Sequence, residues 1–335
     1  MSLASLQKEL LPKIEERLQA YFYSLDFEQN QELREMIAYH MGWGDDNGGH
    51  GKRIRPLLLL LITGACGGGI EDAMPAAVGI EYLHNFTLIH DDIEDNSSIR
   101  HGRKTLWKKW GLAQGINAGD ALFSIAQLAM LDLEQTCSKP TTLEAVREFN
   151  LTCFHLTQGQ HLDIAFETSN NTSVKSYLSM IRGKTAALIS LATRLGGLIG
   201  DINKDRVNKL AEFGESLGIA FQIQDDYLGV WGDSQITGKS AASDLITRKQ
   251  TLPIIYGLQH SVEFRKMWEN EGITSETVES SANLLISCGA QNYTKTEAES
   301  FTNRAFSSLE GLFSQRNPYS DALYELTDLL LHRKH

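Results

Sequence analysis

The sequence predicts an all-α protein, and three observations support this class. Only six of the 335 residues are Pro, which breaks helices. Apolar residues recur at spacings of three and four in several stretches, which is typical of amphipathic helices. Strict alternation of apolar and polar residues, which predicts strands, is hard to find. We therefore expect about ten or more helices.

Three stripes carry the helical periodicity from one end of the chain to the other. They comprise Ile14, Leu18, Tyr21, Phe22 and Leu25 near the beginning, Met180, Lys184, Ala187, Leu188 and Leu191 in the middle, and Leu323, Leu326, Leu329 and Leu330 near the end. Two glycine-rich stretches, Gly42–Gly51 and Gly64–Gly69, are expected to be loops. Because no linker or low-complexity tract divides the chain, we expect a single domain over residues 1–335.

Composition excludes some classes of function. The net charge of −11, from 31 basic and 42 acidic residues, argues against nucleic-acid binding as the main activity. The longest apolar run, Leu57 to Ile62, is too short to cross a bilayer. Four isolated Cys and the absence of a signal peptide favour a soluble, cytoplasmic protein.

An acidic segment, LIHDDIEDNSSIRHG, raises the question of which cation it binds. On a helix Asp91 and Asp95 share a face, because they are four residues apart, and Asp92 lies about 100° around the axis. Carboxylates suit Mg²⁺, which takes its other ligands from phosphate and water. A similar segment ends at Asp225 and Asp226, so two helices with Asp pairs are expected to face each other across a bundle. The alternative for each segment is a solvated helix face.

Basic residues accompany these carboxylates, although each one taken singly would be an ordinary surface charge. Lys52 and Arg55 are three apart, so the first turn of a helix would direct both the same way, beside a helix N-terminus that favours anions. Other basic residues occur in RHG, GKTAAL and GKSAASDLITRKQTLP. The GKT and GKS segments are not P-loops, because the Gly that must precede each by five residues is absent.

The order of these segments from about Gly51 to Pro253 resembles the trans-isoprenyl diphosphate synthases, also called polyprenyl synthases. The resemblance implies an isoprenoid-synthase helical bundle with a deep central cavity. It implies that isopentenyl diphosphate binds Lys52, Arg55, His84 and His101. It places the allylic diphosphate on Arg100, Lys184, Thr185, Gln222, Lys239 and Lys249. It assigns Mg²⁺ to Asp91, Asp92, Asp95 and Asp225, with Gln160, Asp163 and Asp226 near the metals.

Two positions depart from the family pattern. His101 stands where the family has the second Arg of an Arg-Arg pair, and an imidazole lacks the bidentate fork of a guanidinium. We therefore expect weaker or pH-dependent binding of isopentenyl diphosphate. Gly229 stands where the family often has a closing Asp, which leaves Asp225 and Asp226 in the second acidic segment.

The implied activity is that of a Mg²⁺-dependent prenyltransferase, which condenses isopentenyl diphosphate with an allylic diphosphate. Phe86 lies five residues before Asp91 and is expected to limit the product to twenty carbons, or to fifteen. The family implies a homodimer. Two alternatives stay open, namely a terpene-cyclase-like enzyme on the same fold and a non-catalytic subunit that binds prenyl diphosphates.

Overall fold

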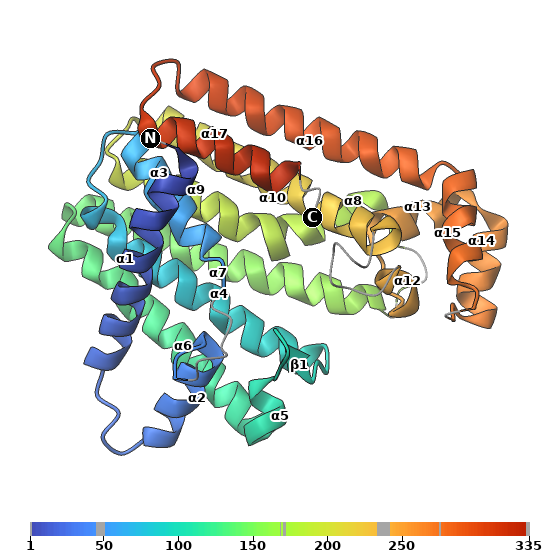
Figure 1. Ribbon diagram of the computed structural model, residues 1–335, viewed down its shortest axis with the longest axis horizontal. Helices are drawn as coiled ribbons and strands as arrows, with labels where there is room; N and C mark the ends of the chain where they lie inside the picture. Colours follow the sequence, from blue (N-terminus) through green and yellow to red (C-terminus); the bar gives the residue numbers. More distant parts are fainter. Residues whose placement is uncertain are drawn as a thin grey trace. The chain divides into compact units, whose positions relative to one another are not determined.

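The computed structural model describes residues 2–44, 51–167, 169, 172–232, 242–274 and 276–332. Helices dominate these residues, and the strands among them form one pair of two-residue strands, so the predicted all-α class is confirmed (Figure 1). No helix within the described ranges has both the length and the apolar character needed to cross a bilayer.

The chain folds as two compact units. Unit 1 takes the described residues within 1–149, 192–207 and 316–323, and unit 2 those within 150–191, 208–315 and 324–335. Each unit is described by itself below. The single domain over residues 1–335 and its central cavity stay predictions.

Unit 1 contains the N-terminal helices, a short hairpin and the first part of the long helix α7. Its elements are α1 (Leu3–Ser24), α2 (Gln31–Met41), α3 (Ile54–Ala65), η1 (Glu71–Ala73), α4 (Met74–Glu94), β1 (Ile99–Arg100), β2 (Arg103–Lys104), α5 (Leu106–Trp110), α6 (Leu112–Leu131), η2 (Asp132–Gln135) and the start of α7 (Lys139–Glu167). Parts of α9 (Ala187–Ile199), α10 (Lys204–Trp231) and α17 (Pro318–Leu331) complete it.

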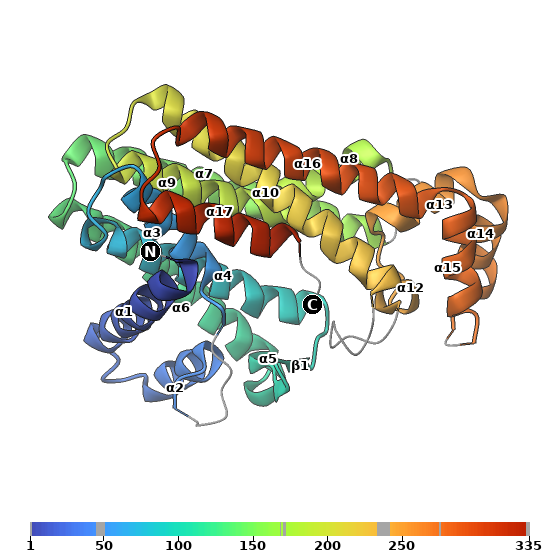
Figure 2. The ribbon, with the colours of Figure 1, turned by 45° about the horizontal axis from the view of Figure 1, so that its top comes forward.

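Apolar stripes explain the helices of unit 1. The side chains of Ile14, Leu18 and Phe22 in α1 are fully buried, as the periodicity predicted, and Leu25 caps the helix end. α4 packs along α6 in both ribbon views (Figures 1 and 2). The expected loop Gly64–Gly69 is wrong at its start, because α3 continues to Ala65 and the Tyr319 ring lies against Gly64. Most of the expected loop Gly42–Gly51 lies outside the described residues.

Unit 2 contains the rest of α7, α9, α10 and α17. Its other elements are α8 (Val174–Ile181), η3 (Arg182–Ala186), α12 (Ser243–Ile246), α13 (Leu252–His260), α14 (Val262–Lys266), η4 (Met267–Glu271), α15 (Val278–Ser287) and α16 (Ala290–Leu312). The segments α13, α14 and α15 pack together at one end of α16 (Figure 2). Their core includes Ile254, Phe264, Trp268 and Leu285. We call the segment from α14 to α15 the terminal lobe.

The two later stripes are only partly confirmed. Met180, Leu188 and Leu191 are buried, but the helix between them is interrupted by the π-helical turn η3. Leu323, Leu326 and Leu330 are buried in α17, whereas Leu329 is 57% exposed. Leu329 was predicted to share the buried stripe, and this prediction is wrong. Its side of α17 is exposed, whereas the side with the other three Leu residues is buried.

Candidate active site

The first acidic segment forms the C-terminal end of α4. Asp91 and Asp92 lie in the last turn, and Asp95 is the C-cap residue, whose N–H donates to the Asp91 carbonyl at 2.8 Å. The expected i, i+4 relation therefore holds in the backbone. Carboxylates at this negative end of the helix dipole are destabilising, by about 0.3–1 kcal/mol each. The arrangement favours binding of a cation.

Asp92 binds Arg100, which lies on the β-hairpin that follows α4. The Arg100 Nε lies 3.0 Å from both carboxylate oxygens of Asp92. Burial raises the pKa of Asp92, and Arg100 offsets only part of that effect. The hairpin thus holds a guanidinium at the end of α4. The predicted roles of Asp92 as a metal ligand and of Arg100 as a diphosphate ligand stay predictions.

His101 occupies the tip of this hairpin. His101 and Gly102 have φ values of 50° and 76°, which suit the two central residues of the turn that joins twisted strands. His is among the few residues with a side chain that are enriched in this left-handed region. The His101 side chain is exposed. This hairpin was not predicted from the sequence. The His101-Gly102 pair was the one local signal that could have indicated it.

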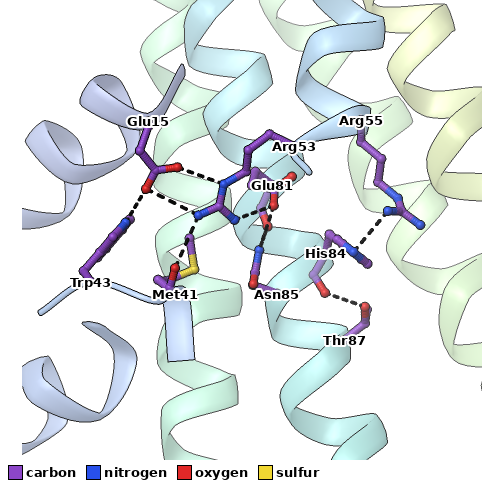
Figure 3. Close-up of polar contacts among 9 residues, drawn as sticks. All are labelled: Glu15, Met41, Trp43, Arg53, Arg55, Glu81, His84, Asn85 and Thr87. Carbon is purple, nitrogen blue, oxygen red and sulfur yellow. Dashed lines mark hydrogen bonds and ion pairs between the residues drawn. The ribbon is translucent and has the colours of Figure 1, made fainter. Parts of the chain in front are cut away.

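Two neighbouring arginines have opposite surroundings, and Arg53 is the neutralised one (Figure 3). Its guanidinium donates to Glu15 at 3.0 Å and to Glu81 at 2.8 Å, and Glu15 also accepts from the Trp43 indole. Burial lowers the pKa of Arg53, but Glu81 and Glu15 outweigh it and raise the pKa. Arg53 is therefore a structural cation that ties α1, α3 and α4 together.

Arg55, two residues later, has only a neutral partner among the described contacts (Figure 3). Its Nη1 lies 3.0 Å from His84 Nε2, which must accept because a guanidinium only donates. Burial, followed by the charge of Arg55, lowers the pKa of His84 well below its usual value, so the ring is neutral. The Arg55 Nε is buried with no hydrogen-bond partner in the described part of the chain.

This arrangement makes the Arg55 guanidinium a half-buried cation whose charge is incompletely compensated, with its Nε fully buried. Burial lowers the pKa of Arg55, and Glu81 offsets only part of the effect. A buried charge without a charged partner is costly unless an anion binds to it. The arrangement therefore favours an anion beside Arg55 within unit 1, and the roles of Arg55 and His84 as diphosphate ligands stay predictions.

Lys52 departs from its expected placement. The first helical residue of α3 is Ile54, and Arg53 before it has a left-handed φ of 48°. Lys52 consequently lies outside the helix, with an exposed side chain, and the expectation that the first turn aligns it with Arg55 is wrong. Its role as a diphosphate ligand stays a prediction.

Two residues beside these groups were not predicted from the sequence. His40 in α2 has a buried Nε2 without a hydrogen-bond partner among the described residues, and burial lowers the pKa of His40 to about 3. Phe123 in α6 lies against Phe86, with ring centroids 5.0 Å apart, and His90 flanks Phe86 at 4.7 Å. No local pattern singled out His40 or Phe123, because both depend on contacts between helices.

A second group of predicted residues lies in unit 2, where α7 and α10 approach the π-helical turn η3. A Cβ built on Gly159 would lie 2.2 Å from the backbone N of Lys184. A Cβ built on Gly218 would lie 2.5 Å from the Cα of Ala186. Glycine therefore allows the backbones of α7 and α10 to touch the turn. Such turns inside α-helices are rare and frequent at functional sites.

A pocket in unit 2 gathers most of the predicted allylic-diphosphate ligands. Lys184 Nζ lies 2.5 Å from Asp163, and the Thr185 hydroxyl donates to Gln222 at 2.9 Å. The pocket is lined by Asp163, Tyr177, Met180, Ile181, Lys184, Thr185, Gln222, Asp226, Lys249, Gln250 and Thr251. Tyr177, Gln250 and Thr251 were not predicted from the sequence. Gln160 and Asp225 lie on α7 and α10 but are not among the lining residues, and Lys239 lies outside the described residues.

Asp226 organises one wall of the pocket. Its carboxylate accepts hydrogen bonds from the Tyr177 hydroxyl, Gln222 at 2.9 Å and the Leu252 N–H at 3.1 Å. Burial raises the pKa of Asp226 to about 6, although these donors favour the charged form. Desolvation lowers the pKa of Lys249, but nearby carboxylates outweigh it and raise the pKa, so Lys249 stays charged.

Gly229 has a structural reason in this unit. A Cβ at position 229 would lie 2.2 Å from Oδ2 of Asp244, which follows in α12. The carboxylate of Asp244 therefore occupies the space next to α10 that the new side chain of a Gly229→Asp variant would enter. The departure from the family pattern accompanies this contact.

The carboxylates suit a metal that shares its ligands with a substrate. In the parts of both units that are described, no three His, Cys, Asp or Glu side chains gather closely enough to hold a metal ion. Asp91 and Asp95 in unit 1 and Asp225 in unit 2 are hard oxygen donors. Mg²⁺ prefers such donors and usually takes only one or two from protein, with phosphate and water completing its octahedron. In each unit taken by itself, these carboxylates therefore fit Mg²⁺ that takes its remaining ligands from a diphosphate and water.

Comparison with known proteins gives consistent matches. The model of the family described as polyprenyl synthetase matches residues 31–285. A (2E,6E)-farnesyl diphosphate synthase of Mycobacterium tuberculosis is 38% identical over 68% of this chain and 64% of its own length. A geranylgeranyl diphosphate synthase of Methanosarcina mazei is 34% identical over 85% of this chain and 86% of its own.

The fold gives the same result. The crystal structure of a polyprenyl synthetase from Streptomyces coelicolor superimposes with a TM-score of 0.88 at 31% identity, covering 98% of this chain and 100% of that one. The alignment with the mycobacterial relative spans less than two thirds of that protein.

Proposed function

Because the chain belongs to the polyprenyl synthetase family, we propose that it is a short-chain trans-isoprenyl diphosphate synthase. It condenses isopentenyl diphosphate with an allylic diphosphate, and its product is geranylgeranyl or farnesyl diphosphate. The names of the relatives support this product range. The observation that carries the proposal is Arg55, a half-buried guanidinium whose buried Nε has no described partner and whose neighbour His84 is neutral.

Unit 1 supplies the proposed isopentenyl-diphosphate subsite. Arg55 offers its Nε to a diphosphate oxygen, and His84 orients the guanidinium by accepting from Nη1. Lys52 and His101, both exposed, stay predicted ligands of the same diphosphate. Two diphosphate charges would offset the desolvation of Arg55.

Unit 2 supplies the proposed allylic subsite. Lys184 and Lys249 bring two cations to one pocket, and Thr185 brings a hydroxyl. The Oγ1 of Thr251 is buried without a hydrogen-bond partner among the described residues, so it is a further donor for a diphosphate oxygen. Arg100 and Lys239 stay predicted ligands of the same diphosphate.

Polyprenyl synthases are in general metal-dependent, and we propose Mg²⁺ as the metal of this chain. In unit 1, Asp91 and Asp95 would hold Mg²⁺, with Asp92 as a further predicted ligand. In unit 2, Asp225 would hold Mg²⁺, with Gln160, Asp163 and Asp226 as the predicted residues near the metal. When bound, Mg²⁺ supplies Lewis-acid stabilisation of the leaving pyrophosphate.

The chain's own residues carry the rest of the proposed mechanism. The allylic C–O bond breaks, and the cations of Lys184 and Lys249 stabilise the charge that grows on pyrophosphate. The double bond of isopentenyl diphosphate forms the new C–C bond with the allylic cation, and the lost proton goes to pyrophosphate. Apolar residues such as Phe86 exclude the water that would otherwise capture the cation.

A product assay tests this function. The chain is incubated with isopentenyl diphosphate and each of three allylic starters, with Mg²⁺ present or chelated, and the products are separated by chromatography. The proposal expects chain elongation that needs both substrates and stops on chelation. Turnover of an allylic diphosphate alone would identify the cyclase-like alternative. Binding without turnover would identify a non-catalytic subunit.

Phe86→Ala is expected to lengthen the product, because it removes the ring that meets Phe123 at the level where the growing chain would pass. The measurement is the chain-length distribution at fixed substrate ratio. Phe154→Ala, which removes a 60% exposed ring in unit 2, is the control and should leave the distribution unchanged. An unaltered distribution in Phe86→Ala would reject the role of this residue.

His101→Arg is expected to lower the KM for isopentenyl diphosphate by about threefold to tenfold, because a guanidinium forms charge-assisted, bidentate hydrogen bonds with phosphate. The KM for the allylic substrate should change less than twofold, roughly, since His101 is assigned to the other diphosphate. Steady-state kinetics with each substrate varied in turn measures both. A KM for isopentenyl diphosphate that stays at the parent value counts against the assignment.

The homodimer and the cytoplasmic location stay predictions. One observation supports the homodimer, namely that α6 exposes large apolar side chains near both of its ends. Their exposed fractions are 55% for Leu112, 42% for Ile116, 47% for Leu128 and 50% for Leu131. A second copy of the chain would cover these side chains.

A further inference from the structure

Arg248 holds a backbone conformation that side chains seldom adopt. Its φ is 57°, in the left-handed region, and it lies between α12 and Lys249. A Cβ makes this region unfavourable for an ordinary residue. Such a conformation persists when surrounding contacts hold it, and it is often found beside functional sites.

The side chain of Arg248 supplies such a contact. Its Nη2 donates to the carbonyl of Trp268 at 2.6 Å, and its guanidinium carbon lies 5.0 Å from the centroid of the Trp268 ring. Trp268 belongs to η4 in the terminal lobe, is 7% exposed and packs with Phe264 in the core there. Arg248 is therefore anchored on a buried, packed part of unit 2.

The residues that follow Arg248, namely Lys249, Gln250 and Thr251, line the pocket instead. The N–H of Lys249 donates to the Asp244 carbonyl at 3.0 Å. Gln250 donates to the carbonyls of Phe166 and Ser169, each at 2.6 Å. Lys249 itself lines the pocket. The left-handed turn at Arg248 thus separates one side chain that contacts the terminal lobe from the next, which reaches the pocket.

We propose that Arg248 is a positioning residue, whose anchor on Trp268 holds the left-handed turn that directs Lys249 toward the allylic diphosphate. The inference rests on the proposed function, because it assigns the diphosphate as the partner of Lys249. Arg248 itself is not placed in contact with substrate. The terminal lobe thereby acquires a part in substrate binding through one hydrogen bond.

Two variants of Arg248 separate positioning from simple packing. Arg248→Ala removes the anchor and keeps the conformational cost of a Cβ, whereas Arg248→Gly removes the anchor and the cost together. We expect Arg248→Ala to raise the KM for the allylic diphosphate by about tenfold, the effect of losing roughly one hydrogen bond to a charged group. Arg248→Gly should stay within about threefold of the parent. The KM for isopentenyl diphosphate should stay at the parent value in both variants.

Calorimetric titration with inorganic pyrophosphate, with and without Mg²⁺, provides a readout that needs no turnover. The affinity should fall in Arg248→Ala and in Lys249→Ala, and stay near the parent value in Arg248→Gly. Arg265→Ala is the matched control, because Arg265 also donates to a main-chain carbonyl, that of Leu258 at 2.7 Å, and does not line the pocket. It should bind pyrophosphate like the parent. Thermal unfolding confirms that each variant is folded.

The outcomes distinguish the inference from the proposed function. Equal pyrophosphate affinities in Arg248→Ala and Arg248→Gly, whether at the parent value or both reduced, would overturn the positioning role. An unchanged pyrophosphate affinity in Lys249→Ala would also overturn it, because Lys249 would then not bind the diphosphate. If the parent chain makes no elongated product, the proposed function is wrong. The order of the pyrophosphate affinities among the variants still tests the positioning role of Arg248 in that case.

Discussion

In Arg55→Met, kcat/KM for isopentenyl diphosphate falls by about 100-fold, while the free energy of unfolding rises by about 1 kcal/mol. The activity falls because the proposed subsite loses its half-buried cation. The stability rises because Met removes a desolvated charge whose described hydrogen-bond partner, His84, is neutral. Steady-state kinetics and urea unfolding measure the two effects.

Arg53→Met is the matched control two residues away. It leaves Glu15 and Glu81 without the guanidinium that contacts them at 3.0 and 2.8 Å. Breaking a buried ion pair from one side costs about 3–5 kcal/mol, so this variant should lose stability. Similar unfolding free energies for the two variants would show that the surroundings of the two arginines do not differ as described.

Gly159→Ala is expected to cost about 2–3 kcal/mol of stability and to lower kcat/KM for the allylic diphosphate by about tenfold or more. The added methyl would lie 2.2 Å from the backbone N of Lys184, so α7 and the π-helical turn must separate. That movement displaces Lys184 and Thr185 from the pocket. Unfolding by urea and kinetics with the allylic substrate varied measure the two losses.

Gly311→Ala in α16 adds the same methyl where no atom lies within 4 Å. Replacing an unstrained helical Gly by Ala stabilises by about 0.5–1 kcal/mol, and the activity should not change. If Gly159→Ala behaves like Gly311→Ala, the close approach of α7 to the turn is not a requirement of the fold.

Periodicity predicted the elements whose burial follows from spacing alone. The stripe of α1 places Ile14, Leu18 and Phe22 on one side, and all three are fully buried. The two Asp pairs were likewise expected on helices, and both lie near helix C-termini, in α4 and α10. Such patterns are local, so a sequence reveals them directly.

The remaining features depend on residues that are distant in the chain. Arg53 and Arg55 look alike in GKRIRP, and their roles differ because Glu15, 38 residues earlier, and Glu81, 28 residues later, reach the first of them. The π-helical turn at Lys184 depends on Gly159 in another helix. The hairpin at His101 has strands of two residues, too short for an alternating pattern.

The most direct test of the central claim is a crystal structure of the chain with isopentenyl diphosphate, an unreactive allylic diphosphate analogue and Mg²⁺. We expect a diphosphate oxygen within hydrogen-bond distance of Arg55 Nε and a second diphosphate on Lys184 and Lys249. A diphosphate bound away from Arg55, with its Nε still lacking a partner, would contradict the account.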